Sequence, residues 1–559
     1  MMNKHLILLI LGCLPVLAQS QTVERIYTAT DRSVYLSGEE VWCSLFLLDA
    51  DRQQTSAFSA VAYLELVGAE GTVATAKVSL REGRGAGRFR IPASTPTGSY
   101  ALLAYTALNA NEAGTGWMAG NRPLSVFNVT STKRAGDVSF LDEKAYNALK
   151  RPVTENAGGI TVLPSNWNIK QGEHFFLTLT SPKDADLCIS IFAEDEILPP
   201  AASNIATFME TVKKEKKPLF TGKRIPEYDG EIVYAAVEGL HPESMEELAG
   251  EAVATLSSAG SPSDVYVGKV GEGGKLVFFT NNIFGDRELV CEINSRMQSG
   301  GYVTIPDNYL HPEHVELSPL VLSKAQYMPL IRRKAAFGVS LQADTLVQFI
   351  PRRQDFLLDA IPPVHYHLDD YTRFHTIDEI LVEFIPELRI HTFLGKPAIQ
   401  MTVRDAQSRR RENRDNILVM LDGVVISDIS LLRNMDAMLL EDIDVYTQDV
   451  ALGGISYNGV VNFVSRKNYV RTLDFPASVR VLDFQGVSYP LAYLGGVDSG
   501  TEKDLRQLLF WHPALELTAG QGFKIDLQAP SYEGRFRLVA EGLTADGEPV
   551  HQEFLFKVQ

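Results

Sequence analysis

Residues 416–467 read NILVMLDGVVISDISLLRNMDAMLLEDIDVYTQDVALGGISYNGVVNFVSRK, and the rest of the chain is best interpreted around them. An apolar run stops at Asp422-Gly423 and resumes directly afterwards, which predicts two short strands joined by a two-residue turn. Apolar residues at three- and four-residue spacing then predict a helix with Ser430 as its N-cap. Two more strands follow, and the second begins at Gly459. The stretch therefore predicts a small α+β unit.

This order of elements resembles the plug domain of TonB-dependent outer-membrane receptors, through the motifs LDGV, EDIDVY and NGVVNFVSRK. A capping box formed by Thr376 and Glu379 predicts a helix ahead of these motifs, so a plug-like domain is expected over 364–470. Glycine supplies the positive φ of the turn and aspartate tolerates it. Asp422, Gly423 and Gly459 are therefore assigned a role in the fold, and the contact residues for any partner remain open.

The length of the chain after the plug-like domain argues against a transport pore of its own. In a complete receptor the plug fills a barrel of about 22 strands, which requires several hundred residues. Here 92 residues (559 − 467) follow Lys467, and they have the pattern of a sandwich. We expect a plug fold that is detached from transport.

The N-terminal part predicts antiparallel sandwiches, because short alternating strands are separated by Gly, Asp and Pro. Residues 27–41 read YTATDRSVYLSGEEV and residues 96–100 read PTGSY. Both resemble the second macroglobulin-type (MG2) domain of the alpha-2-macroglobulin family. That family traps proteases through a thioester motif, C-G-E-Q, which surrounds none of the four cysteines here. The resemblance therefore implies a spacer or docking module.

The expected fold class is mainly β, with tandem antiparallel sandwiches of macroglobulin or immunoglobulin type and one small α+β domain. The layout resembles envelope proteins of the Bacteroidota type that combine macroglobulin and plug-like domains. The expected parts are a signal peptide (1–20), an MG2-like sandwich (21–130), a second macroglobulin-like sandwich (131–225), a sandwich resembling the transthyretin-like regulatory modules of carboxypeptidases (226–300), a connector (301–363), the plug-like domain (364–470) and a C-terminal sandwich (471–559).

The first twenty residues have the pattern of a secretory signal peptide. Lys4 precedes an apolar run over 6–17, and Ala18-Gln19-Ser20 provides a small-x-small cleavage site. Lipidation at Cys13 is an open alternative, although the apolar run continues past that residue. No later apolar run reaches the ~18 residues of a membrane span. We expect an exported protein of the periplasm or outer membrane, with the surface face possible and no span of its own.

Composition excludes some partners and some chemistry. The formal net charge is −17, which argues against nucleic acid because phosphate binding needs clustered Lys and Arg. Cys43, Cys188 and Cys291 each lie in an apolar run, as expected of buried free thiols. The pair His365-x-His367, near Asp369 and His375, is too weak a pattern to predict a metal site. Since protease and phosphate-loop motifs are missing, we predict no enzyme, cofactor or metal.

Three functions remain. The first is an accessory or scaffold subunit that docks onto an outer-membrane barrel complex, such as a TonB-dependent transporter or the barrel-assembly or secretion machinery. The alternative is a glycan- or peptide-binding module, which a cluster of exposed aromatic residues on one sandwich rim would favour. The four tryptophans are scattered in the sequence: Trp42, Trp117, Trp167 and Trp511. A macroglobulin-type protease inhibitor is disfavoured by the missing thioester.

Overall fold

Strands account for 51% of the computed structural model and helices for 12%, so the predicted mainly β class is confirmed. The structure describes residues 22–149, 158–194, 202–239, 253–259, 264–294, 302–325, 347–349, 363–404, 411–476, 479–494 and 504–559, apart from a few single positions inside these ranges, together with a few isolated residues between them. The predicted signal peptide, including Cys13, lies outside the described residues.

The first sandwich follows the predicted MG2-like region, and its sheet runs in the order β1-β3-β7-β6-β5-β8-β9-β2. The long strand β6 belongs to both faces, because it pairs with β5 along most of its length and with β7 at Leu80 and Arg81. Side chains such as Leu45, Leu64 and Leu102 fill the core between the faces. The strands are β1 (Glu24–Thr30), β2 (Val34–Leu36), β3 (Glu40–Asp49), β4 (Gln54–Thr55), β5 (Val61–Gly68), β6 (Gly71–Arg81), β7 (Arg84–Arg90), β8 (Thr97–Tyr105), β9 (Arg122–Phe127) and β10 (Arg134–Ala135).

The second sandwich is assembled from two distant parts of the chain, and this differs from the expectation of separate sandwiches over 131–225 and 471–559. Strand β14 lies between β35 and β37, and β13 pairs with β36. Alternation shows which side of a strand is buried but not which strand covers it, so the sequence could not reveal this pairing. The strands are β12 (Thr161–Pro164), β13 (His174–Thr180), β14 (Ala185–Ala193), β22 (Val347–Phe349), β34 (Leu491–Leu494), β35 (Leu508–Leu517), β36 (Gly522–Gln528), β37 (Gly534–Thr544) and β38 (Pro549–Val558).

The third sandwich lies in the predicted region 226–300 and extends beyond it. One sheet runs β18-β15-β20 and the other β17-β16-β19-β33, so β33 returns to it from beyond the α+β domain. A compact apolar core that includes Val233, Leu256 and Phe278 fills the space between the sheets. The strands are β15 (Ile232–Glu238), β16 (Val253–Ser258), β17 (Val265–Lys269), β18 (Lys275–Phe279), β19 (Asp286–Asn294), β20 (Tyr302–Thr304) and β33 (Val479–Gln485).

The α+β domain has the predicted two-residue turn, because Leu421 pairs with Val424 across Asp422-Gly423. Its main sheet runs β23-β29-β32-β27-β28, with β27 parallel to β32, and a smaller sheet runs β24-β25-β26. The elements are β23 (Val364–His367), α5 (Ile377–Phe384), β24 (Leu388–Phe393), β25 (Lys396–Arg404), β26 (Arg411–Arg414), β27 (Leu418–Leu421), β28 (Val424–Val425), α6 (Ile429–Arg433), β29 (Leu440–Tyr446), β30 (Val450–Leu452), β31 (Ile455–Tyr457) and β32 (Val460–Ser465).

The two helices of this domain differ in how well their starts were predicted. Helix α5 begins as expected, since the Thr376 side chain caps it and accepts a hydrogen bond from the Glu379 N–H. Helix α6 begins two residues earlier than predicted: Asp428 is its N-cap, and the Asp428 carboxylate accepts the Ser430 N–H at 2.9 Å. A carboxylate competes well with a hydroxyl for this position.

The predicted connector contains more regular structure than expected. Its first described residues form β20, and β21 (Leu320–Ser323) pairs in parallel with β11 (Val138–Leu141), next to α1 (Glu143–Ala148). Tyr309, Leu310 and Leu317 pack against the first sandwich. Strand β22 pairs with β34 in the second sandwich. The described parts of the connector thus join neighbouring sandwiches.

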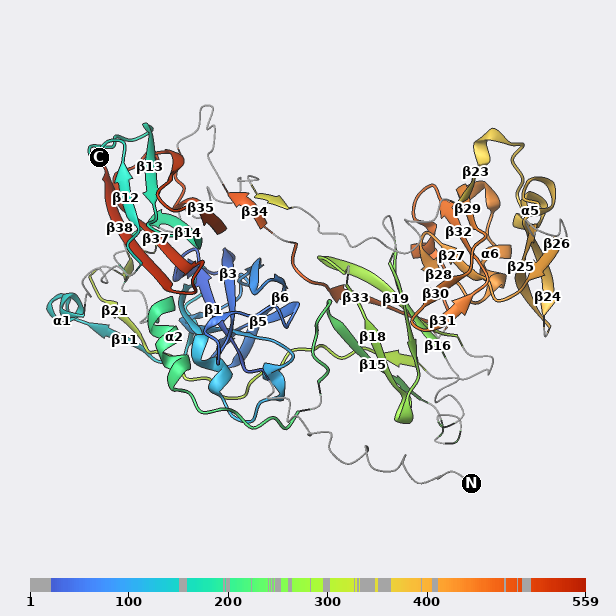
Figure 1. Cartoon of the computed structure of the whole chain (residues 1–559), viewed down its shortest axis with the longest axis horizontal. Helices are drawn as coiled ribbons and strands as arrows, with labels where there is room; N and C mark the ends of the chain where they lie inside the picture. Colours follow the sequence, from blue (N-terminus) through green and yellow to red (C-terminus); the bar gives the residue numbers. More distant parts are fainter. Residues whose placement is uncertain are drawn as a thin grey trace, which may run out of the picture.

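Figure 1 shows how these units are arranged. The first sandwich, in blue, lies between the second sandwich, whose strands are teal and red, and the green third sandwich. The orange α+β domain occupies the far end, next to the third sandwich. Helix α2 (Ile205–Lys214) lies beside the first and second sandwiches and packs on both through Phe208 and Met209. The first sandwich therefore has two interfaces with other sandwiches, one on each side.

Candidate functional site

A buried ion pair lies at the interface between the first and third sandwiches. The Lys77 ammonium, on β6, is 2.6 Å from Glu231 Oε1, which lies just before β15. Both side chains are buried. The ammonium also donates to the Gln485 carbonyl at 2.8 Å and lies 4.2 Å from the centre of the Phe484 ring. The ion pair and the hydrogen bond of Lys77 thus both go to the third sandwich, and the ring of Tyr309 from the connector lies 5.9 Å from the ammonium.

Residues of the connector close this interface from the side. The Asn308 side-chain amide donates to the Ile232 carbonyl at 2.9 Å and to Glu231 Oε1 at 3.4 Å. The Tyr309 hydroxyl donates to Gln485 Oε1 at 2.6 Å. These bonds fix the connector against the third sandwich, and the Leu310 N–H, which donates to the Tyr105 hydroxyl at 2.8 Å, fixes it against the first.

A second carboxylate is buried close by with less compensation. Glu227 Oε1 accepts the Tyr63 hydroxyl at 2.7 Å and the Ile232 N–H at 2.9 Å. Burial raises the pKa of Glu227 to about 7, although these hydrogen bonds oppose the shift. Burial also raises the pKa of Glu231, and Lys77 opposes that shift. The interface therefore contains two carboxyl groups whose charge costs free energy in the folded state.

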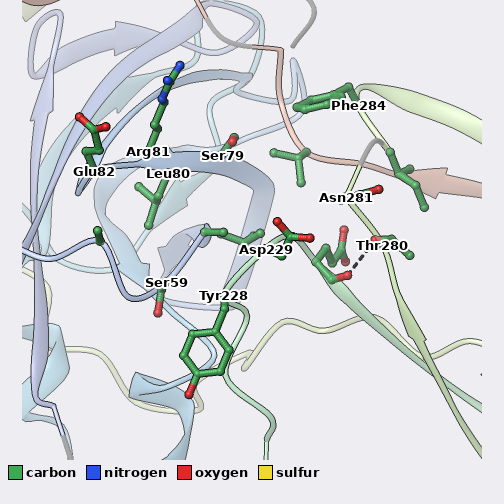
Figure 2. Close-up of a pocket in the computed structure, with 17 residues that line it drawn as sticks. Ser59, Ser79, Leu80, Arg81, Glu82, Tyr228, Asp229, Thr280, Asn281 and Phe284 are labelled. Carbon is green, nitrogen blue, oxygen red and sulfur yellow. Dashed lines mark hydrogen bonds between the residues drawn. The ribbon is translucent and has the colours of Figure 1, made fainter. Parts of the chain in front are cut away.

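A pocket of about 190 Å³ opens beside these carboxylates. Figure 2 shows Arg81 and Glu82 on the wall formed by the first sandwich, with Asp229 and Asn281 on the wall formed by the third. The Thr280 hydroxyl donates to the Glu231 carbonyl at 2.8 Å, which is the bond drawn in Figure 2. The pocket therefore brings charged and amide groups of both sandwiches to one place.

The lining of this pocket contains hydrogen-bonding groups and neither histidine nor cysteine among the described residues. Its buried serine is already engaged, since the Ser59 hydroxyl donates to Glu24 Oε2 at 2.6 Å. A nucleophile with an adjacent base is the minimum for acyl-transfer chemistry. The arrangement is suited to holding two sandwiches together around a polar gap.

The residues of the α+β domain that the sequence assigned to its fold have clear structural roles. Asp422 and Gly423 have φ angles of 51° and 81°. The Asp422 carboxylate also accepts the N–H groups of Ser465 and Val470, at 2.7 and 3.2 Å. At Gly459, with φ at 144°, a Cβ would lie 2.7 Å from the sulfur of Met401. The turn and the close approach require glycine at positions 423 and 459, and aspartate tolerates the positive φ at position 422.

The histidines of the domain pair with aspartates across neighbouring elements. His365 Nδ1 is 2.7 Å from Asp444 Oδ1, and His367 Nδ1 is 2.7 Å from Asp442 Oδ1. His375 Nδ1 lies 3.2 Å from Asp436. The described part of the chain holds no group of three or more His, Cys, Asp or Glu side chains arranged to bind a metal. The contacts of His365 and His367 tie β23 to β29.

The prediction of buried free thiols is confirmed. Cys43, Cys188 and Cys291 are free and buried. Burial raises the pKa of both Cys188 and Cys291 to about 12, so these sulfurs stay protonated at neutral pH.

Sequence reasoning did not single out the ion pair or the pocket. Lys77 and Glu231 are 154 residues apart, and each lies in an ordinary strand pattern. A charged residue on a strand is normally solvated, so the pattern gives no sign that another sandwich covers it. These residues come together only because the first and third sandwiches pack against each other in the folded chain.

Known structures that are similar to this chain include the three bacterial proteins that follow. Trypsin-activated alpha-2-macroglobulin from Escherichia coli is similar over 96% of this chain and 41% of its own, with 9% identity and a TM-score of 0.23. Dimeric latent PorU from Porphyromonas gingivalis is similar over 54% of this chain and 34% of its own, with 9% identity and a TM-score of 0.15. The adhesin InvE from Yersinia pseudotuberculosis is similar over 50% of this chain and 57% of its own, with 11% identity and a TM-score of 0.13.

These likenesses carry no argument about activity or partners, because the identities and TM-scores are low. The chain spans less than half the length of the Escherichia coli and Salmonella alpha-2-macroglobulins to which it is similar. No protein-family model matches the sequence, and no curated protein matches it. Among the described helices, none has the length and apolar character needed to cross a membrane.

Proposed function

We propose that the chain is a non-enzymatic, exported envelope protein that serves as a scaffold subunit of an outer-membrane barrel complex. The α+β domain, which resembles a receptor plug, is the part that meets the partner. The sandwiches hold it at a set distance from the other end of the molecule. The partner class is a TonB-dependent transporter or the barrel-assembly or secretion machinery.

The placement of the α+β domain carries this proposal. It lies at one end of the array, and the chain leaves it through β33, a strand of the third sandwich (Figure 1). The Ser427 N–H donates to Glu292 Oε2 at 3.1 Å, and the Val425 N–H donates to Ser257 Oγ at 3.3 Å. A domain held in this way at the end of the array is suited to presenting a surface to a partner rather than to catalysis.

Exposed apolar side chains on the same domain support a contact role. Val382, on α5, is 79% exposed, and Phe393, at the end of β24, is 53% exposed. Tyr371, Met438 and Leu439 are also exposed. Large apolar side chains that remain in water are favourable contacts for a partner, although single ones are common on any surface.

Co-purification of the full-length protein tests the proposal. A tagged chain would be expressed in its native envelope, crosslinked and recovered from outer membranes, with partners identified by mass spectrometry. We expect a barrel protein to be enriched. Val382→Asp and Phe393→Asp should reduce its recovery, while the control Phe279→Asp, which alters an exposed side chain of the third sandwich, should not. Recovery of a free monomer without an enriched barrel protein would contradict the scaffold role.

A further inference from the structure

The main sheet of the α+β domain has two edges with different surroundings. At one edge, β28, the Val425 N–H donates to Ser257 Oγ of the third sandwich at 3.3 Å. At the other edge, β23, no strand among the described residues pairs with the outer side. Figure 1 shows β23 on the side of the sheet that lies away from the third sandwich. An edge strand leaves a row of N–H and C=O groups that can pair with a further strand.

The sequence of β23, VHYH, lacks the residues that usually protect an open edge. Such edges commonly carry Pro or charged side chains, above all Lys. Three other edge strands follow this rule: β12 ends with Pro164, β24 contains Arg389 and β36 contains Lys524. Strand β23 contains none of these residue types, and Val364 at its start is 40% exposed. Its edge is therefore open to an added strand, although its shortness means that side chains must contribute to binding.

The surface next to one face of β23 is apolar. Val364 and Tyr366 share this face, because alternate residues of a strand point to the same side. Tyr366 packs against the core of the domain, and its hydroxyl donates to Glu387 Oε2 at 2.5 Å. The Tyr371 ring lies 6.3 Å from the Tyr366 ring and 4.9 Å from the Phe384 ring, and Tyr371 is 38% exposed. Val364, Tyr366, Tyr371 and Phe384 thus form an apolar shelf next to the open edge.

The other face of β23 is polar. His365 and His367 lie on it, and their Nδ1 atoms are each 2.7 Å from an aspartate of β29, Asp444 and Asp442 respectively. A strand added to β23 would therefore have different surroundings on its two sides. Its residues would alternate between the apolar shelf and the histidine–aspartate pairs, because successive side chains of a strand point to opposite faces.

The charges near the edge favour a cationic partner. Asp369 and Asp370 directly follow β23, and both are exposed. Asp369 lies 2.5 Å from Arg466 and 3.7 Å from Arg373. Together with the two aspartates of β29, four carboxylates therefore face two guanidinium groups while the histidines are neutral. Complementary charge steers and selects partners, so Lys or Arg suits the polar side of an added strand.

We propose that the open edge of β23 binds an extended segment of a partner protein in which apolar and basic residues alternate. The segment extends the main sheet by one strand, with its apolar side chains on the shelf and its basic side chains beside Asp442 and Asp444. A second copy of this chain is a poorer occupant, because two acidic edges repel each other. The inference rests on the proposed scaffold role for the identity of the partner and names the mode of contact.

A labelled peptide tests the edge on the full-length protein. The probe is a short fluorescein-labelled peptide of alternating Val and Lys, and the matched probe alternates Val and Glu. We expect fluorescence anisotropy to give a Kd between about 10 μM and 1 mM for the Val/Lys peptide and at least about tenfold weaker binding of the Val/Glu peptide. Hydrogen exchange should show new protection of β23 amides by the Val/Lys peptide and no change at β28.

Two valine variants separate the edge from the general negative charge of the chain. Val364→Lys places a cation on the open edge and should weaken binding of the Val/Lys peptide by at least about tenfold. Val481→Lys adds the same charge at a valine that is also 40% exposed, on β33, and should change the Kd by less than about twofold. Unchanged exchange of β29 in both variants would show that the domain remains folded.

The inference is overturned if the Val/Glu peptide binds as tightly, if Val364→Lys binds like the parent protein, or if protection falls outside β23. Self-association in sedimentation that Val364→Lys abolishes would also overturn it, because a second copy would then occupy the edge. The scaffold role fails separately. A bound peptide without an enriched barrel protein in the co-purification would contradict that role alone, whereas undiminished recovery of a barrel protein by Val364→Lys would contradict the edge contact alone.

Discussion

The first sandwich has two interfaces of different character. Toward the second sandwich it buries an apolar cluster in which the Trp42 and Trp511 rings lie 5.7 Å apart. Helix α2 covers this cluster through Phe208 and Met209. Toward the third sandwich it buries the Lys77–Glu231 ion pair and a carboxylate, Glu227. Apolar burial stabilises at any pH, whereas buried carboxylates make an interface depend on pH.

The polar groups at the two interfaces also respond to pH in different ranges. At the second sandwich, Tyr27 donates to Glu541, which is paired with His551 at 3.0 Å. Burial lowers the pKa of His551, but the bonds with Glu541 and Glu553 outweigh burial and raise the pKa to about 9. Its contribution is therefore complete below about pH 6.5 and is lost as the pH rises through about 9. The contribution of Glu227 to stability changes over a lower pH range, between about pH 4.5 and 7.

The largest effect is expected from truncation in the apolar cluster. Trp511→Ala should lower the free energy of opening the interface with the second sandwich by about 3–5 kcal/mol, because a large cavity replaces the ring. The indole N–H of Trp511 has no hydrogen-bond partner among the described residues, so the change removes packing alone. Native-state hydrogen exchange of β3 and β35 measures this free energy.

Trp167→Ala is the matched control for this change, because it deletes the same side chain at an exposed position. We expect its effect on the same amides to stay within about 0.5 kcal/mol. Equal effects of the two substitutions would show that the apolar cluster does not hold the sandwiches together.

The next largest effect is expected at the ion pair. Lys77→Met should cost about 3 kcal/mol at the interface with the third sandwich, because Glu231 then remains buried without its cation. Hydrogen exchange of β6 and β15 reports the change. The double variant Lys77→Met/Glu231→Gln should recover most of the loss. If the double variant is as unstable as the single one, the charge of Glu231 is not the cause.

Local sequence patterns predicted the fold of single units. They did not predict how strands that are far apart in the sequence pair with one another. The Asp422-Gly423 turn and the Thr376 cap were predictable because every contact that defines them lies within a few residues. The pairing of β14 with β37 was not, since Cys188 and Glu541 are partners far apart in sequence. The partner of a residue in a long-range pair can be identified only when the whole fold is known, because the local sequence around each residue is the same with or without that partner. The same reason explains why the carboxylate interface and the pocket were missed.

A change of pH should separate the two interfaces. The raised pKa of Glu227, about 7 against 4.5, means that the folded state favours its neutral form. Its contribution is complete below about pH 4.5 and falls as the pH rises to about 7, by up to about 3 kcal/mol. Exchange at β6 and β15 should therefore speed up between pH 5 and 7.5, after correction for the intrinsic rate. Exchange at β3 and β35 should follow other groups, with His551 making it speed up as the pH rises from about 6.5 to 9.

Glu227→Gln is the matched variant for this titration. It keeps an oxygen to accept the bonds from Tyr63 and the Ile232 N–H but cannot ionise. We expect the hydrogen-exchange rate of β6 and β15 to depend less steeply on pH in this variant, because the contribution of Glu227 to that dependence is removed. An unchanged slope would assign the dependence to another group, with Glu231 as the first alternative.

The smallest effect is expected from Arg84, the ionic contact on the apolar side. Arg84 Nε is 2.7 Å from Asp186 Oδ2, and the guanidinium lies 3.4 Å from the centre of the Phe46 ring. Because the pair is partly solvated, Arg84→Met should cost about 1 kcal/mol and retain the contact with Phe46. Hydrogen exchange of β3 and β35 measures it. If Arg84→Met costs as much free energy as Lys77→Met, ion pairs stabilise both interfaces equally. The two interfaces would then differ only in the pH dependence of their stability.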